Sequence, residues 1–557
     1  MKLDDENLIM ESTAIDAKFY QNLAANTSIN SALERNNLLD SYGPYLALKN
    51  NQFCSLNEVV CDDCTLKLFD EFGAYPAKAY LNTAILLIRF LQTTQFPNYE
   101  IKIQHSVSDG VYGEFKDNNE DINTKIEKLE KAFEKLVAKD LSINPEVIAR
   151  TDAIHYFKSQ ERKDTAQLLQ YCSQDFIVLY NLEGVKVWTP FPVASRTGLI
   201  NVYRFMSYQD GFLLRTPSPG DDTSLQPFKT QDKLFNIFKE FVRWGEILDL
   251  NSIYDINQAI IQNKISEIIK ISEALHERKI ANIAAKIKQE GKKLIFIAGP
   301  SSSGKTTFSK RLAIQLRAMG FKSIPISLDD YFKDRGELRA EQGEDMNFEV
   351  LHALDIELLN EHLQKMLNCE KLAIPAYDFK TGKKIMDSRE IYPDDETFII
   401  LEGLHGINPN LTPDISAKHK FKIYVSALTH LNFNHFNRIA THEMRLIRRI
   451  VRDARYRGYP ADHTIKLWGN VLEGEKKYIF KYQGNADVMF NSALVYETSV
   501  LKNEAEKYLK AVPLESESFP IANRLVNILS YYLPAAYKEI PPTSIIREFV
   551  GGSSFSF

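Results

Sequence analysis

Residues 294–307 read LIFIAGPSSSGKTT, an apolar run followed at once by the pattern Gly-x-x-x-x-Gly-Lys-Thr, and this stretch decides the fold of the second half of the chain. The apolar run predicts a β-strand, and SKRLAIQLRAM at 309–319 predicts a helix. A strand, a glycine-rich turn and a helix form the context in which this pattern binds phosphate. The backbone N–H groups of the turn and the N-terminus of the helix make a fixed anion cradle. We therefore expect the chain to bind a nucleoside triphosphate.

The cradle assigns a role to each polar residue of the turn. Lys305 places a positive charge on the β- and γ-phosphates, and the Thr306 hydroxyl is placed to bind Mg²⁺. ATP and Mg²⁺ are therefore the expected cofactors. The residues expected to contact the triphosphate are Gly299, Ser301, Ser302, Ser303, Gly304, Lys305, Thr306 and Thr307.

Length and composition limit the number of domains and the class of protein. A chain of 557 residues is too long for one ordinary core, and 44% hydrophobic with 25% charged residues is typical of a soluble globular protein. The formal net charge of −5 gives no argument for a nucleic-acid or membrane partner. The acidic start MKLDDENLIMES lacks the features of a secretory signal, and the apolar runs are shorter than the roughly 20 residues that cross a membrane.

Cysteine usage favours a reducing compartment, and the cytoplasm is the expected location. Five cysteines in a chain of this length are too sparse for a disulfide scaffold. Cys61-x-x-Cys64 has the spacing of half a zinc or redox site, but no second pair follows it.

The pattern along the chain predicts an α/β protein with five parts. Residues 1–75 read as a small α/β or β-rich module, 76–230 as an α+β region, 231–285 as a helical connector, 286–510 as the domain that holds the phosphate loop, and 511–557 as a C-terminal tail. In the second half the β-type runs LIFIA, KSIPIS, FIIL, FKIYVS and ADVMFN alternate with helical stretches. This alternation is the signature of a parallel sheet covered by helices on both faces.

Three acidic residues follow β-type runs after the loop. Asp329 and Asp330 come after KSIPIS and Leu328, and Glu402 comes directly after FIIL. Residues beyond the carboxyl ends of parallel strands line the ligand crevice. One carboxylate there can accept a proton from an attacking hydroxyl, and another can organise Mg²⁺. A plain turn with a helix N-cap is the alternative interpretation of Asp329 and Asp330.

A third group is cationic. The stretch RLIRRIVRDARYRGY at 445–459 is predicted to be largely helical. Arg445, Arg448 and Arg452 share one helix face at i, i+3 and i+7, which suits a clamp on phosphoryl oxygens, with a solvated charged face as the alternative.

The second half contains, in this order, GPSSSGKTT, SLDDYFKD, MNFE, IPAYDF, LEGLHG and RLIRRIVRDARYRG. In their order and spacing, these motifs resemble the uridine kinase branch of the phosphoribulokinase and uridine kinase family, over about residues 290–505. The resemblance implies ATP-dependent phosphorylation of the 5′-hydroxyl of a ribonucleoside. It implies Asp329 as the general base, Glu349 and Tyr377 as nucleoside contacts, and Glu402 as a residue that assists Mg²⁺. It also implies that the lid and phosphate positions are Arg449, Arg452 and Arg457. In that branch, Asp stands in place of Glu349 and a base-contacting His stands near the position of Gly382.

The first half resembles another family. Three stretches carry this resemblance: YLNTAILLIRFL, IKIQHSVSDGVYGEF and VKVWTPFPVASRTGLINVYRFMSYQDGFLLR. They are similar to the N-terminal additional domain of threonyl-tRNA synthetase. The residues before 75 are similar to its ubiquitin-like leading module. The positions that match the editing-site ligands of that family carry Leu81, Ile85, Trp188 and Pro192, none of which can ligate a metal.

Two functions therefore compete. The first is a nucleoside kinase, and the second is a nucleotide-gated RNA-binding or regulatory protein that acts through its first half. The kinase is favoured because the phosphate loop, a candidate general base, a candidate Mg²⁺-binding acid and the arginines are all present. The first half, by contrast, shows no basic patch with interleaved aromatic residues. A switch GTPase is disfavoured because no Asn-Lys-x-Asp follows the loop. The nucleobase and the oligomeric state, a homo-oligomer included, are left open.

Overall fold

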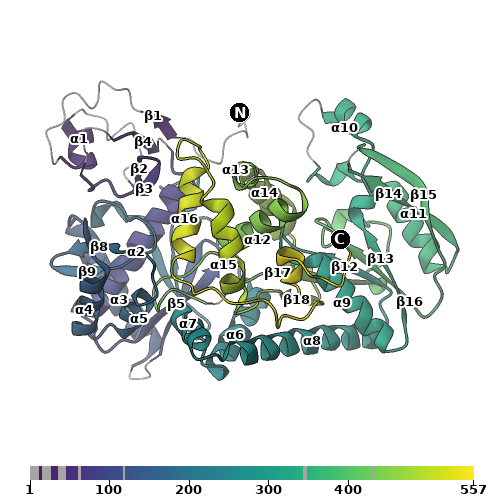
Figure 1. The fold of residues 1–557 in the computed structure, drawn as a ribbon, viewed down its shortest axis with the longest axis horizontal. Coiled ribbons are helices and arrows are strands. Elements are labelled where there is room, and N and C mark those ends of the chain that lie inside the picture. The colour runs from purple at the N-terminus through teal and green to yellow at the C-terminus, as the bar shows by residue number, and fades with distance from the viewer. Residues whose placement is uncertain are drawn as a thin grey trace.

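The computed structural model of this chain describes residues 12–14, 27–35, 45–59, 64–69, 71–116, 120–342, 348–379, 381–429 and 431–556 (Figure 1). Cys61, half of the Cys-x-x-Cys pair considered above, lies outside these ranges. Within them, no helix combines the length and apolarity that crossing a membrane requires.

A five-stranded parallel sheet organises the second half of the chain. Its strand order is β13 (Lys322–Ser327), β16 (Thr397–Glu402), β12 (Leu294–Ala298), β17 (Lys420–Ser426) and β18 (Val488–Asn491). Every neighbouring pair is parallel. The five β-type runs predicted from the sequence are these five strands, and β12, which leads into the phosphate loop, lies at the centre.

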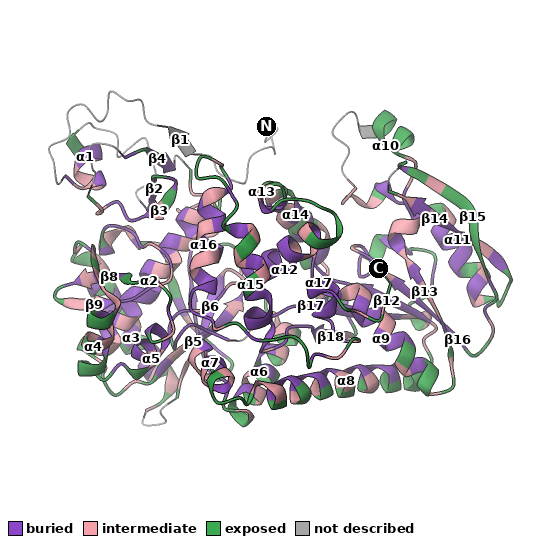
Figure 2. Ribbon diagram, in the orientation of Figure 1, coloured by how far each residue is buried: buried purple, intermediate pink, exposed green. Residues whose placement is uncertain are grey.

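The sheet is buried on both faces because its strands are apolar at successive positions. Ile295 and Ile297 of β12 belong to a core shared with α9 (Lys305–Ala318) and α8 (Ile265–Glu290). Leu294 and Phe296 face the opposite core, which includes α11 (Ile356–Leu367). Figure 2 shows the central strands buried, whereas α10 (Arg335–Gln342) at one end of the molecule is largely exposed. The hairpin of β14 (Leu372–Asp378) and β15 (Lys383–Ile391) lies beside α11.

The first half is built from antiparallel sheets and helices. A small sheet has the order β1 (Ser12–Ala14), β4 (Leu66–Phe69), β2 (Ala47–Lys49) and β3 (Gln52–Cys54), and α1 (Ile29–Arg35) accompanies it. A second sheet has the order β10 (Arg204–Tyr208), β11 (Gly211–Arg215), β6 (Gly110–Phe115) and β5 (Ile101–Val107). A third contains β7 (Asn144–Ala149), β8 (Phe176–Leu182) and β9 (Val185–Val187). The helices are α2 (Ala74–Thr94), α3 (Ile122–Ala138), α4 (Arg150–Ser159) and α5 (Lys163–Leu169).

The chain before β10 is not extended throughout. Thr197–Leu199 form a 3-10 turn, and β10 begins at Arg204. The Thr197 hydroxyl accepts a hydrogen bond from the Leu141 N–H and donates one to the Leu136 carbonyl. This side chain ties the turn to the end of α3, a tertiary contact that overrides the local β preference.

The two halves share one hydrophobic core. The Trp188 ring of the first half lies 5.6 Å from the Phe433 ring and 5.5 Å from the Tyr531 ring, measured between centroids. Residues 231–285 contain α6 (Asp232–Ile247), α7 (Ile253–Ile261) and most of α8. Figure 1 shows α8 along the lower edge of the molecule, where it packs against α9.

The C-terminal segment is part of the same core. It contains α16 (Phe519–Leu529) and the short α17 (Arg547–Val550) and follows α15 (Glu497–Leu509). Ile545 and Phe549 are fully buried. A Cβ atom on Gly304 would lie 2.5 Å from Ile545 Cγ2, so this segment packs directly on the end of the phosphate loop.

Truncating Phe549 should destabilise the whole protein. Phe549→Ala removes a fully buried ring, for which the expected loss in free energy of unfolding is about 3–5 kcal/mol. Chemical denaturation of the full chain measures it. The matched control Phe176→Ala, at a side chain that is 66% exposed, should change stability by about 0.5 kcal/mol or less. Equal effects of the two substitutions would contradict the packing of this segment.

Candidate active site

The phosphate loop has the backbone shape that its glycines allow. Gly304 adopts φ +79°, a left-handed conformation that ends the loop at the start of α9. A Cβ atom on Gly299 would lie 1.9 Å from the Val425 carbonyl oxygen, so only glycine fits there. Lys305 Nζ lies 3.3 Å from the Pro300 carbonyl oxygen, over the loop. The Ser302 and Ser303 hydroxyls are buried and have no hydrogen-bond partner among the described residues.

Two arginines of α12 (Thr441–Tyr456) hydrogen-bond to the backbone of this loop. Arg445 makes a bidentate pair with Glu475, at 2.6 and 2.7 Å, and donates to the Ser301 carbonyl at 3.1 Å. The same Glu475 carboxylate accepts the Ser301 N–H at 2.7 Å. Arg445 and Glu475 are both nearly inaccessible to solvent, with side chains 2% and 1% exposed. They support the loop backbone and do not face a transferring phosphoryl group.

Arg448 has the same structural role. Its guanidinium pairs with Glu497 of α15 and donates to the Ser302 carbonyl at 3.3 Å and the Ser492 carbonyl at 3.1 Å. The side chain is fully buried. The predicted phosphoryl clamp of Arg445, Arg448 and Arg452 is therefore wrong for its first two members, because buried carboxylates hold both guanidinium groups.

The remaining predicted arginines converge on one carboxylate. Asp453, whose side chain is 2% exposed, accepts from Arg449 Nε at 3.2 Å and from the Arg452 guanidinium at 3.0 Å, and it lies 3.4 Å from the Arg457 guanidinium. Arg449 also donates to the Ser301 hydroxyl at 3.0 Å. Three cations against one anion leave an excess of positive charge next to the loop. The sequence analysis did not single out Asp453, although it stands four residues after Arg449 and four before Arg457, the spacing of helical ion pairs.

The carboxylates predicted at the strand ends meet beside the loop. The parallel register aligns Glu402 with Ile297 of β12 and with Ser327 of β13. The Thr306 hydroxyl donates to Glu402 Oε1 at 3.1 Å. Burial, followed by the charge of Glu402, raises the pKa of Asp329 to about 7, with Lys305 acting in the opposite direction. Asp329 therefore sits close enough to Glu402 and Lys305 to sense both charges.

The neighbouring acid has a different surrounding. Asp330 Oδ1 accepts the Tyr377 N–H at 3.4 Å, a contact with β14. The Ser327 side chain caps the 3-10 turn Leu328–Tyr331 through the Asp329 N–H at 3.2 Å. This turn directs Asp329 and Asp330 to different neighbours.

The pair of Thr306 and Glu402 fits a magnesium ion. Glu402 Oε2 is buried with no hydrogen-bond partner among the described residues, so an oxygen ligand is free beside the Thr306 hydroxyl. Mg²⁺ prefers oxygen ligands and takes few of them from the protein when phosphate is present. No cluster of three or more His, Cys, Asp or Glu side chains in the described ranges could hold a metal ion by itself. The arrangement is suited to a metal that arrives with a triphosphate.

An aromatic wall lies near the acids. The Tyr377 ring lies 5.6 Å from Phe332, 6.4 Å from Phe348 and 5.1 Å from Phe379, measured between centroids. Phe379 is 59% exposed, and the buried Tyr377 hydroxyl has no hydrogen-bond partner among the described residues. Of these four aromatic residues, the sequence analysis named only Tyr377, as a nucleoside contact implied by the family resemblance.

Glu349 is placed close to the same cations. Burial raises its pKa, and the charges of Lys305 and Arg449 act against that shift. Its carbonyl oxygen lies 3.0 Å from His405 Nε2. The Thr307 hydroxyl, expected at the triphosphate, instead donates to Glu548 of the C-terminal segment at 2.7 Å.

Comparisons with known proteins identify the family of the second half. The model described as "Phosphoribulokinase / Uridine kinase family" matches residues 294–499. A uridine kinase of Bacillus velezensis is 30% identical over 179 residues, which are 32% of this chain and 75% of that protein. The chain belongs to the phosphoribulokinase and uridine kinase family. A uridine kinase of Clostridium perfringens is 31% identical over 180 residues, or 32% of this chain and 76% of that protein.

The likeness extends over nearly the whole of some relatives. A uridine kinase of Bacillus pumilus is 27% identical over 224 residues, which cover 38% of this chain and 97% of that protein. The resemblance seen in the sequence is thus confirmed for the second half, and membership of this family supports a kinase. We refer to residues 286–557 as the kinase half.

Breaking the buried pair behind the loop should be costly. Glu475→Ala leaves Arg445 buried without its carboxylate, and we expect a loss of about 3–5 kcal/mol in the free energy of unfolding. The control Glu341→Ala breaks an ion pair with Lys333 in which the Glu341 side chain is 45% exposed, and should cost about 1 kcal/mol or less. Denaturant titration distinguishes the two. A loss of less than 1 kcal/mol for Glu475→Ala would contradict the bracing role.

Proposed function

We propose that the kinase half transfers the γ-phosphoryl group of ATP to the 5′-hydroxyl of a ribonucleoside, giving the nucleoside monophosphate and ADP. The observation that carries this proposal is the meeting of three groups at one sheet edge. The phosphate loop with Lys305, the Thr306–Glu402 pair and the Asp329 carboxylate come from three neighbouring parallel strands. A phosphoryl transferase needs such a cradle, a metal position and a proton acceptor.

Each group has one step in the reaction. Asp329 takes the proton of the acceptor hydroxyl as that oxygen bonds to the γ-phosphorus, and the bond to the bridging oxygen of ADP breaks. Lys305 and the Arg449 and Arg452 guanidiniums stabilise negative charge on the phosphoryl oxygens. Mg²⁺, when bound with ATP by Thr306 and Glu402, supplies Lewis-acid stabilisation of the same charge.

The acceptor is assigned from the family resemblance and the walls of the site. Glu349 is a carboxylate suited to the ribose hydroxyls, and Tyr377 with its neighbouring phenylalanines offers rings against which a base can stack. Arg457 completes the set of residues at the substrate. Because Glu349 is one methylene longer than the Asp of the family and the base-reading His is missing near Gly382, we expect base selectivity different from that of an ordinary uridine kinase.

The domain boundaries and the nature of the first half also stay proposals. We propose that residues 1–75 and 76–230 form modules like those at the N-terminus of threonyl-tRNA synthetase, and their α+β architecture is compatible with this. Leu81, Ile85, Trp188 and Pro192 offer no metal ligand, so hydrolytic editing is not part of the proposal.

A screen of acceptors tests the kinase proposal. Purified full-length protein with MgATP should release ADP when uridine, cytidine, adenosine, guanosine or inosine is the productive acceptor, with ribose preferred over 2′-deoxyribose by about tenfold or more. Lys305→Ala should lower kcat by about 10²-fold or more, and Asp329→Asn by roughly 10² to 10⁴-fold. Asp330→Asn is the matched control and should be far less affected.

Three results would count against this assignment. Equal use of ribo- and deoxyribonucleosides would remove the role given to Glu349. A stronger defect in Asp330→Asn than in Asp329→Asn would move the base by one residue. ADP release with a sugar phosphate such as ribulose 5-phosphate, and with no nucleoside, would assign the other acceptor class of the family.

The pH dependence of the reaction should report Asp329. A general base is active when deprotonated, so kcat/KM should fall about tenfold per pH unit below the pKa of Asp329, which is raised to about 7. The charge of Glu402 contributes to this raised pKa, and Glu402→Gln should therefore move the acid limb to lower pH as well as reduce the rate. Initial rates from pH 5 to 9 measure both effects. An acid limb at the same pH in Glu402→Gln would show that another group controls it.

A further inference from the structure

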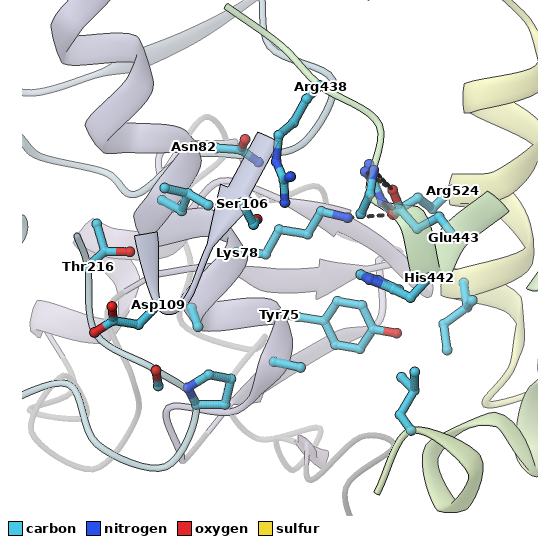
Figure 3. A pocket seen from close by; sticks show the side chains of 18 of the residues that line it. Tyr75, Lys78, Asn82, Ser106, Asp109, Thr216, Arg438, His442, Glu443 and Arg524 are labelled. Carbon is cyan, nitrogen blue, oxygen red and sulfur yellow. Dashed lines mark hydrogen bonds and ion pairs between the residues drawn. The ribbon is translucent and has the colours of Figure 1, made fainter. Parts of the chain in front are cut away.

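A cavity of about 380 Å³ lies between the two halves of the chain (Figure 3). Its walls come from α2 of the first half and from α12, α14 (Trp468–Glu475) and α16 of the kinase half. Volumes of this size are typical of small-molecule sites. None of the residues assigned to the phosphate loop lines it.

The charged side chains that line the cavity carry an excess of positive charge. Glu443 is 5% exposed and serves two cations, with Lys78 Nζ 2.5 Å from Oε1 and Arg524 Nε 2.5 Å from the same oxygen. Asp109, the second carboxylate at the cavity, is held by the guanidinium of Arg215 at 2.8 and 2.6 Å. Both carboxylates are therefore already paired with cations of the protein. Arg438 is a further cation on the wall; the charge of Glu443 acts on it, but neither of these two carboxylates forms an ion pair with it.

Arg438 has unused hydrogen-bonding capacity. Its half-buried guanidinium makes no hydrogen bond or ion pair with any residue that the structure describes. Figure 3 shows it directed toward Lys78, with the dashed contacts of Lys78 and Arg524 to Glu443 beyond. Asn82 Nδ2, on the same cavity, is buried and likewise has no partner among the described residues. Two sets of donors thus face one cavity without an acceptor.

The electrostatics agree with this geometry. Burial, and then the charge of Arg524, lower the pKa of Lys78 to about 7, even though Glu443 acts in the opposite direction. Burying a cation away from water without an anion beside it is energetically unfavourable. A bound anion would offset that cost, and a guanidinium binds phosphate or carboxylate through two parallel hydrogen bonds.

The rest of the cavity wall is apolar. Trp468, Leu472, Ile521 and Leu525 line it. The Trp468 ring also lies 5.3 Å from the Arg445 guanidinium and 5.8 Å from that of Arg449, measured to the ring centroid, so this tryptophan separates the cavity from the arginines at the loop. A ligand that fills the cavity needs an apolar body as well as a charge.

We propose that this cavity is a second ligand site, which binds a small organic anion, a phosphate or carboxylate joined to an apolar body, with Arg438 and Asn82 as donors to the anionic group. The proposal does not depend on the acceptor used by the kinase half. It rests on paired carboxylates, unpartnered donors and an adjacent apolar wall in one cavity.

Binding of simple probes to the full-length protein tests this site. Phenyl phosphate and benzoate carry the two anionic groups on an apolar ring, and benzyl alcohol is the neutral counterpart. The protein is first saturated with MgADP, so that the phosphate loop is filled, and heats of binding are measured by calorimetry. We expect phenyl phosphate or benzoate to bind at one site per chain, at least about tenfold more tightly than benzyl alcohol. The better of the two anions identifies the anionic group.

Variants assign the binding to the cavity. Arg438→Gln should weaken the better probe by about tenfold or more, and Asn82→Leu, which removes the amide at similar size, should weaken it too. Arg243→Gln changes an exposed arginine of α6 outside the cavity and should bind as the unaltered protein does. Unchanged ADP affinity and melting temperature establish that each variant is folded.

The proposal is overturned by any of three results: neither anion binds the ADP-saturated protein, benzyl alcohol binds as tightly as the anions, or Arg438→Gln and Asn82→Leu both retain the original affinity. Because the readout is binding heat, loss of kinase activity would leave the test intact.

Discussion

The buried pairing of α12 arginines with distant carboxylates holds the phosphate loop in place. Arg445 and Glu475 contact the carbonyl and the N–H of Ser301, and Arg448 adds the carbonyl of Ser302. Such pairs cost desolvation, so they persist only where further hydrogen bonds satisfy the charged groups. Here those hydrogen bonds go to the loop backbone. Buried contacts therefore join the loop to α12, α14 and α15, and the groups that would meet a triphosphate are positioned before it binds.

The same helix serves two regions of the molecule. The first turn of α12 presents Glu443 to the cavity between the halves, and the following turns present Arg445 and Arg449 to the loop. Trp468 packs against both arginines and lines the cavity. The first half is thus joined to the kinase half through shared side chains and a common core.

The C-terminal segment completes the loop from the other side. Ile545 lies against Gly304, and Glu548 accepts the Thr307 hydroxyl. The phosphate loop is consequently contacted by Arg445, which is 144 residues from Ser301, and by Glu548, which is 241 residues from Thr307. Its shape depends on the complete kinase half.

The sequence by itself determined the features that local pattern controls. Five β-type runs and the glycine spacing gave the parallel sheet and its loop, because strand burial and φ preferences are properties of neighbouring residues. The position of Asp329 and Glu402 after neighbouring strands also predicted that both line one crevice. Family resemblance, carried by several motifs in order, was confirmed for this half.

Only the tertiary structure decided which charged residues face the phosphate site. Arg445, Arg448 and Arg452 share a helix face, yet the first two are fixed in the core and the third pairs with Asp453. The carboxylates that make this difference, Glu475 and Glu497, lie 30 and 49 residues further along the chain. Helical spacing reports which residues share a face, but not what that face meets. The physical reason is that a buried charge is placed by its partner, and the partner is brought near only by the fold.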